Sequence, residues 1–160
     1  MQNEKKTSYV WLLLIQFALA FEWLHSGWGK WTGSAFMDNL GKTLEGFAAK
    51  TQYDSYGSFL TNTVIPNTEV FGNIIRSGEV LVGLAFVIGG IVLLYRKSLP
   101  TPVTWILVAA FFGGALMNLN FFLASGATSP SAWGLNLLMS LLQIILGLHY
   151  IFNRKDLAVA

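Results

Sequence analysis

A few ionisable side chains lie inside or beside long apolar stretches of this 160-residue chain. Glu22 and His25 are three residues apart, as are Arg76 and Glu79, so on helices each pair would share one face. Such a group costs a few kcal/mol in a bilayer unless it is paired, hydrated or functional. Carboxylates in a partly dry site also serve as proton donors and acceptors. We therefore predict Glu22, His25 and Glu79 as catalytic residues.

Cationic and amide side chains near these groups are candidates for ligand binding. Amides can bond to a ligand or across a helix interface, and a cation of the outer segment such as Lys30 can reach inward to the polar groups. The predicted binding residues are Lys30, Arg76, Asn118, Asn120 and Asn136.

Polar and small residues also recur at helical spacing, as a buried seam requires. The seams are Gly72, Arg76, Glu79, Gly83, Phe86 and Gly90, and Asn136, Ser140, Gln143 and Gly147. They fit either a ligand cavity or a hydrogen-bonded packing core.

Four apolar runs must position these residues. They cover 8–24, 72–95, 103–124 and 132–152, each near the ~20 residues that a helix needs to cross a bilayer. A chain with 54% hydrophobic and 11% charged residues has too little polar surface for a soluble fold of this size. The sequence predicts an all-α integral membrane four-helix bundle, forming a single membrane domain over 1–160.

The same spacing gives the depth of the polar residues. At ~1.5 Å per residue, Glu22, Glu79, Asn118 and Asn136 lie roughly 21–27 Å from the other end of their helices. We expect them at one level in the outer third of the bilayer, where Lys30 or a tyrosine of the outer loop can reach inward.

The basic residues at the helix ends predict the orientation. Lys5, Lys6, Arg96, Lys97, Arg154 and Lys155 share one side if both termini are cytoplasmic. We expect a multi-pass protein of the cell membrane. The first run also resembles a secretory signal that ends at Ala18-Leu19-Ala20, so its cleavage is the alternative to retention.

The outer loop, 26–71, contains a second kind of pattern. Phe36, Leu40, Leu44 and Phe47 recur at the spacing of an amphipathic helix lying on the membrane, with Ser34 as its cap. Asn67 or Thr68 would cap the second spanning helix. The loop is either a cover that shields the bundle from water or a lid over a ligand site.

Several functions are disfavoured. The chain has no cysteine, so it has no disulfide, thiolate metal site or dithiol centre. His25 and His149 fall at opposite membrane faces, so we expect no metal or haem, and we expect no nucleic-acid partner. Gly27, Gly29 and Gly33 lack a preceding strand and are expected to form a turn.

Three motifs carry a family resemblance. They are 21-FEWLHSGWGKW-31, 78-GEVLVG-83 and 117-MNLNFFLASG-126. In them the chain resembles the DoxX/DoxD group of small four-helix membrane proteins, to which a subunit of thiosulfate:quinone oxidoreductase belongs.

The resemblance implies a membrane subunit that passes electrons to a quinone, with thiosulfate or another reduced sulfur compound as donor. Glu22, Glu79 or His25 would relay protons, and Lys30 and Arg76 would attract the anionic donor. A partner redox subunit would complete the enzyme unless both substrates meet in one pocket. The alternative is a non-enzymatic module that scaffolds a redox complex or binds a hydrophobic ligand. The sequence does not decide the oligomeric state, but a homo-oligomer could form by close helix contact at Gly83, Gly89 and Gly90.

Overall fold

The computed structural model describes residues 2–96, 98–125 and 128–153, with side chains from Val10 onward. Its elements are α1 (Gln2–Thr32), α2 (Ala35–Lys50), α3 (Asp54–Phe59), the π-helical turn η1 (Leu60–Val64), the 3₁₀ turn η2 (Ile65–Asn67), α4 (Thr68–Arg96), α5 (Thr101–Ser125) and α6 (Pro130–Phe152). Four of these, α1, α4, α5 and α6, belong to helical stretches long and apolar enough to cross a bilayer. The protein is an all-α, multi-pass membrane four-helix bundle, as predicted.

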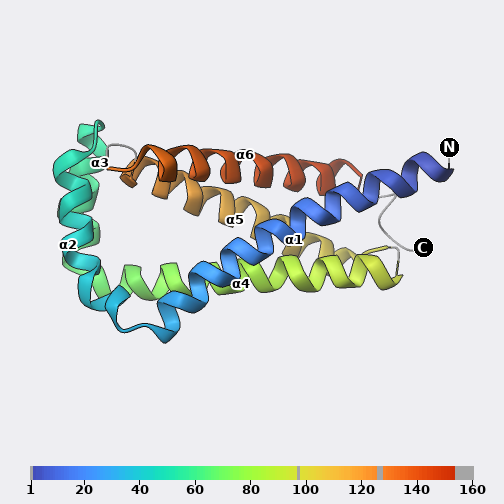
Figure 1. The fold of residues 1–160 in the computed structure, drawn as a ribbon, viewed down its shortest axis with the longest axis horizontal. Coiled ribbons are helices and arrows are strands. Elements are labelled where there is room, and N and C mark those ends of the chain that lie inside the picture. The colour runs from blue at the N-terminus through green and yellow to red at the C-terminus, as the bar shows by residue number, and fades with distance from the viewer. Residues whose placement is uncertain (1, 97, 126–127, 154–160) are drawn as a thin grey trace.

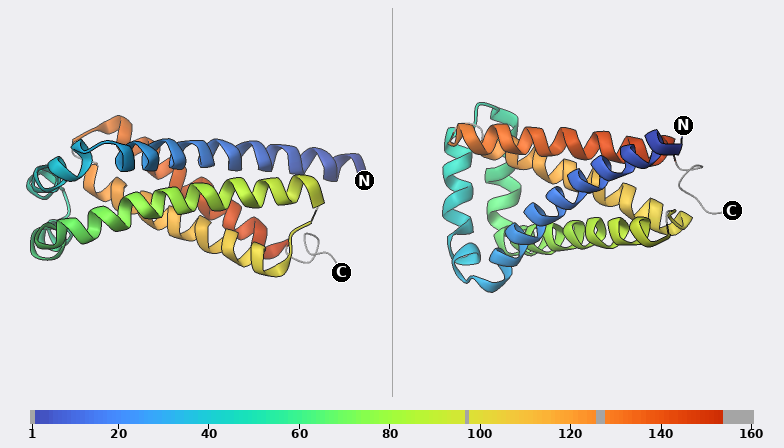
Figure 2. Two further views of the ribbon diagram at one scale, coloured as in Figure 1. Left: turned by 90° about the horizontal axis from the view of Figure 1, so that it is seen from below. Right: turned by 45° about the vertical axis from the view of Figure 1, so that its right-hand side comes forward.

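The helix α2 lies across one end of the four long helices (Figures 1 and 2). We call this the cap end, and residues 33–67 the cap segment. Along the bundle, α1 packs on α4 and α5 on α6, and the contact of α4 with α5 joins the two pairs. The start of α1, the end of α4, the start of α5 and the end of α6 lie together at the opposite, terminal end (Figure 1).

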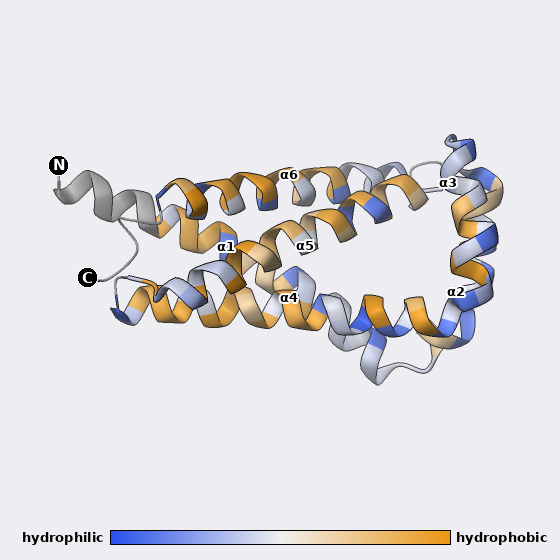
Figure 3. Ribbon diagram, turned by 180° about the vertical axis from the view of Figure 1, so that it is seen from behind, coloured by the Kyte–Doolittle hydropathy of each residue, from blue (hydrophilic) through white to orange (hydrophobic). Residues whose placement is uncertain are grey.

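Apolar residues cover most of the long helices, whereas α2 has one apolar and one polar side (Figure 3). The basic residues at the terminal end include Arg96. The side chains of Lys5 and Lys6, and residues Lys97, Arg154 and Lys155, lie outside the described part of the chain.

The first spanning helix is longer than its apolar run. The sequence predicts a helix over 8–24, but α1 continues to Thr32. The predicted turn is therefore wrong for Gly27 and Gly29, which are helical, whereas Gly33 does lie between α1 and α2. A Cβ on Gly27 would lie 2.8 Å from Cγ2 and 3.0 Å from the backbone nitrogen of Val80. Glycine therefore lets α1 approach the α4 backbone while its own backbone stays hydrogen-bonded inside the helix.

The amphipathic helix predicted in the outer loop is present as α2. Leu40 and Leu44 are buried on its inner side and form a small core with Leu60 and Val64 of η1. Ser34 stands at the N-cap position, but its side chain makes no capping hydrogen bond. The cap segment thus packs by its apolar side on the end of the bundle.

No separate cap opens the second spanning helix. The chain stays helical from α3 through η1 and η2 into α4, because the turn around Pro66, which lacks an N–H, is absorbed as π and 3₁₀ geometry. Asn67 Nδ2 donates to Thr63 O and Thr68 Oγ1 donates to Ile65 O. Both side chains bond back to carbonyl groups, so neither is the predicted N-cap.

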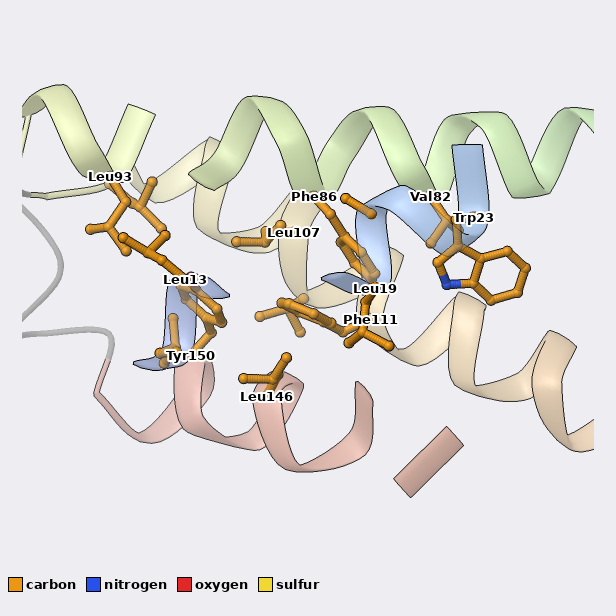
Figure 4. Packing of buried hydrophobic residues seen from close by; sticks show 14 of the residues in the cluster. Leu13, Leu19, Trp23, Val82, Phe86, Leu93, Leu107, Phe111, Leu146 and Tyr150 are labelled. Atoms are coloured by element: carbon orange, nitrogen blue, oxygen red, sulfur yellow. The ribbon is translucent and has the colours of Figure 1, made fainter. Parts of the chain in front are cut away.

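The apolar core runs along the centre of the bundle (Figure 4). The Phe86 and Phe111 rings stack with centroids 4.3 Å apart, and Phe111 stacks on Tyr150 at 5.5 Å. The helix α1 belongs to this core, to which it contributes Leu12, Leu13, Leu19, Ala20 and Trp23.

The glycine seam of α4 packs inside the protomer. Gly83 lies against Leu24 and Gly90 against Phe17, both of α1, and Gly89 lies against Leu107 of α5. All three glycines are buried. They therefore provide no surface for a second subunit, contrary to the sequence-based expectation.

The close approach at Gly83 gives a stability prediction. In Gly83→Ala the new Cβ would meet Leu24 Cγ at 2.6 Å and the Leu24 backbone nitrogen at 3.1 Å, so α1 and α4 must move apart. We expect a loss of about 1–3 kcal/mol, as for other overpacked sites, read as a lower thermal unfolding temperature in detergent. The matched control is Gly113→Ala on α5, where nothing lies within 4 Å. Equal unfolding temperatures for the two variants would contradict the close packing.

Candidate functional site

An ion pair between α1 and α4 is the centre of the candidate site. Lys30 Nζ donates to Glu79 Oε1 at 2.7 Å and to Oε2 at 2.6 Å. It also donates to Ser26 Oγ, one turn earlier on α1, at 2.6 Å. The Glu79 side chain is 1% exposed and that of Lys30 23%. Within the described part of the chain this is the only salt bridge, and its three acceptors match the three N–H groups of the ammonium.

Local packing brings these groups together. Gly27 lies one turn before Lys30 and packs against Glu79 Cβ. The two helices are therefore close enough here for the Lys30 side chain to reach the carboxylate. The first turn of α2 then covers the pair, since Lys30 Nζ lies 5.6 Å from the centroid of the Phe36 ring. The cap segment thus lies directly over the ion pair.

Arg76 belongs to a neighbouring cluster and does not pair with Glu79. Its Nε and Nη2 donate to Asn73 Oδ1 at 3.0 and 2.5 Å. Its Cζ lies 4.0 Å from the centroid of the Trp31 ring, a cation–π contact from α4 to α1. The two cations predicted to attract an anion are both at the cap end, each engaged within the protein.

Among the described residues, three buried side-chain atoms have no hydrogen-bond partner. They are Trp23 Nε1, Asn118 Nδ2 and Gln143 Oε1, on α1, α5 and α6, and the three side chains are at most 2% exposed. An unsatisfied buried group costs about 1–3 kcal/mol. Such atoms mark places where a water molecule or a polar ligand atom would bind.

These atoms lie in one section of the interior. Trp23 lies beside Val82 (Figure 4). A Cβ on Gly114 would meet both Val82 and Gln143 Oε1, and Asn118 follows Gly114 by one turn of α5. Val82 is three residues from Glu79, and Met117, next to Asn118, lies against Gly78, so this section adjoins the ion pair. We call Trp23, Asn118 and Gln143 the inner polar group.

A further polar contact at the bundle centre was missing from the sequence-based prediction. Gln16 is fully buried, donates to Phe86 O at 2.7 Å and accepts from Tyr150 OH at 2.6 Å. It ties α1 to α4 and α6. Its signal in the sequence is a lone amide in the middle of the first apolar run.

Two predicted catalytic residues lie away from this site. Glu22 and His25 are exposed on the outer side of α1, and the His25 ring stacks on Phe21 with centroids 5.7 Å apart. The structure therefore does not bring them to Glu79. The three-residue spacing of Glu22 and His25 predicts that both lie on one side of a helix, but it does not show whether that side faces the bundle.

The predicted amides are also divided. Asn120 Nδ2 donates to Leu116 O of its own helix, and the Asn120 carbonyl accepts from Tyr56 OH of α3 at 3.1 Å. Asn136 is half-buried near the start of α6. Only Asn118 is both buried and unpartnered. A tyrosine of the outer segment does reach inward, but to a backbone oxygen.

Metal-ligating groups and surface hollows are the remaining features of the described residues. They contain no group of three His, Cys, Asp or Glu side chains that could hold a metal. An open hollow of about 430 Å³ lies between the end of α2 and the α3–η1 turn, lined by small and polar residues that include Thr51, Asp54 and Asn62. None of the predicted site residues lines it.

The geometry defines a membrane four-helix bundle with one buried ion pair under a covering helix. No family model, curated protein or solved structure matches the chain. The resemblance to the DoxX/DoxD group rests on the three sequence motifs and stays a prediction.

Removing one partner of the ion pair tests its energetic role. In Lys30→Met the Glu79 carboxylate keeps its burial and loses its counter-charge, so we expect a loss of about 3 kcal/mol, the lower end for breaking a buried pair, because Lys30 is partly exposed. The double variant Lys30→Met/Glu79→Met should recover most of this loss. Lys42→Met, on the exposed side of α2, is the control. The stability of the two variants and of the control is measured as the unfolding midpoint in detergent. A double variant no more stable than Lys30→Met would contradict the role of Lys30 as the counter-charge of Glu79.

Proposed function

We propose that the protein is the membrane subunit of a quinone-linked oxidoreductase, with thiosulfate or another reduced sulfur compound as donor. The resemblance supplies this reaction class. The observation that supports it here is a buried carboxylate–ammonium pair adjoining unpartnered buried donors, Trp23 Nε1 and Asn118 Nδ2. A quinone is an apolar ring with two carbonyl acceptors, so it needs such donors in an otherwise apolar interior.

The reaction requires two electrons and two protons for each quinone reduced to quinol. The donor gives the electrons, as when two thiosulfate ions join through a new S–S bond. In this proposal Asn118 and Trp23 donate hydrogen bonds to a quinone carbonyl oxygen, and Glu79 passes protons toward it from the cap end. Lys30, whose ammonium contacts both carboxylate oxygens, supplies the counter-charge of the ionised form.

The anionic donor would approach from the cap side, where Lys30 and Arg76 supply positive charge. Electrons reach the quinone either from a donor in the same pocket or through a partner redox subunit. Glu22 and His25 lie outside this route, because their side chains are on the outer side of α1.

The competing proposal is a non-enzymatic module that supports a redox complex or holds a hydrophobic ligand. One observation favours it. All three N–H groups of Lys30 are used by Glu79 and Ser26, so the pair is closed within the protein. In that case it locks α1 to α4, and the inner polar group holds water or a ligand head group.

We further propose that the cap end is extracytoplasmic and both termini are cytoplasmic, in the cell membrane. Both termini must lie on the same side of the membrane, since α1 starts and α6 ends at the terminal end of the bundle. The positive-inside rule then gives the direction.

Orientation can be tested with single cysteines, because the chain has none. We expect a membrane-impermeant maleimide to label Ser55→Cys, exposed in the cap segment, on intact cells. Thr101→Cys, exposed at the terminal end, should be labelled only after permeabilisation. The reverse pattern would contradict the assigned orientation.

A matched pair of asparagines tests the quinone proposal. We expect Asn118→Leu to raise the KM for a short-chain quinone about fivefold, since a buried hydrogen bond contributes about 1 kcal/mol. Asn120→Leu, whose amide bonds to its own helix, should leave the KM unchanged. Steady-state quinone reduction by the protein in lipid, with thiosulfate as donor, gives both values.

Substitution of the carboxylate separates the two proposals. Glu79→Gln should slow turnover by about a hundredfold or more if it relays protons, while Arg76→Gln should act mainly on the KM for thiosulfate. Turnover unaffected by Glu79→Gln would remove this residue from the mechanism. No turnover with any sulfur donor, alone or with co-purified subunits, would favour the non-enzymatic module.

A further inference from the structure

The exposed side of α1 differs from those of the other spanning helices. Among the described residues, no exposed side chain is charged or titratable from Val70 to Leu94 of α4, from Trp105 to Leu119 of α5, or from Trp133 to Phe152 of α6. These surfaces suit lipid. On α1, in contrast, Glu22 and His25 are both exposed.

Glu22 lies within the stretch of α1 that is long and apolar enough to span a bilayer. Leu24 packs on Gly83, which is near the middle of α4, so Glu22 is at about mid-bundle. It also lies ten residues before the end of α1, or ~15 Å along the axis. No hydrogen bond or ion pair within the described chain reaches it. A charged group facing lipid at this depth is costly, and such groups in membrane proteins are paired or face water.

The two residues belong to a regular seam. Exposed residues of α1 recur at alternating spacings of four and three, the repeat of helices that pack side by side. The seam is Trp11, Ile15, Ala18, Glu22, His25 and Gly29. Ala18 and Gly29 are small enough for a neighbouring helix to come close. The exposed face of any helix repeats in this way, so what distinguishes α1 is the acid and the base within the repeat.

We propose that this seam is the interface of a homodimer, in which α1 packs on α1 of a second copy. All copies insert into the membrane in the same direction, so the two-fold axis lies along the membrane normal and the two α1 helices are parallel. In such a parallel pair each seam residue lies level with its counterpart in the other copy and diagonally next to the following seam position, so each Glu22 is within reach of the His25 of the other copy. The acid and the base in one seam make it complementary to itself, which identifies the second copy as the occupant.

Cysteine crosslinking tests the interface on an otherwise unaltered chain. In isolated membranes treated with copper–phenanthroline, Ala18→Cys should give a disulfide-linked dimer that a reductant dissolves, because a disulfide forms only between closely spaced Cα atoms. Ile88→Cys is exposed on α4 at similar depth and should remain monomeric. A missing dimer for Ala18→Cys, equal crosslinking of both variants, or a product that contains a different protein would each overturn the proposal.

A charge exchange tests the polar contact. Glu22→His should weaken self-association in detergent about tenfold, as expected for one interhelical polar contact in a membrane, and Glu22→His/His25→Glu should restore it. Native mass spectrometry gives the dimer fraction. A dimer fraction unchanged by Glu22→His, or not restored by the double variant, would overturn the assigned contact. Neither residue belongs to the ion-pair site, so failure here is independent of the quinone proposal.

Discussion

In hydrocarbon a polar group has no water to bind, so its partners must come from the protein. The Glu79 carboxylate is the strictest case in this molecule, because it is buried in a spanning helix and 1% exposed. Its counter-charge is Lys30, which lies on another helix and beyond the end of the apolar run. Much of the cap end follows from this contact. The first helix must continue past its apolar run to carry Lys30, and Gly27 must face α4 so that the two backbones come close.

The position of α2 follows from the same requirement. The Lys30 side chain is partly exposed, and an open pair would be weakened by water and salt. The start of α2 places Phe36 beside the ammonium, while Leu40 and Leu44 pack onto η1. The cap segment therefore both fills an apolar surface and reduces the access of water to the pair. The outer loop was interpreted either as a fixed cover or as a lid over a ligand site. These differ only in whether α2 moves, so the structure is compatible with both.

Hydropathy predicted the fold well, because a helix that crosses the bilayer needs a continuous apolar run of about 20 residues, and such runs are easy to see in the sequence. The four spans and the amphipathic α2 follow from composition and from the spacing of residues such as Leu40 and Leu44. Helix ends were harder. Polar residues such as Ser26 and Lys30 suggested a loop, but both belong to α1, where Lys30 binds Ser26 of the same helix and Glu79 of α4. Likewise Pro66 suggested a helix start, although the chain absorbs it within a continuous helix.

The site was predicted only in part, because residue type and depth do not fix direction. Glu22 and Glu79 are both carboxylates at similar predicted depth, yet one is exposed and the other buried. Which side of α1 faces inward is decided by contacts with distant parts of the chain, such as Gln16 with Tyr150. No spacing within α1 contains this information. A charge on the outer side then has the same need for a partner that Glu79 meets inside. Since the described part of the protomer offers none, the requirement that organises its interior also argues for an assembly beyond one chain.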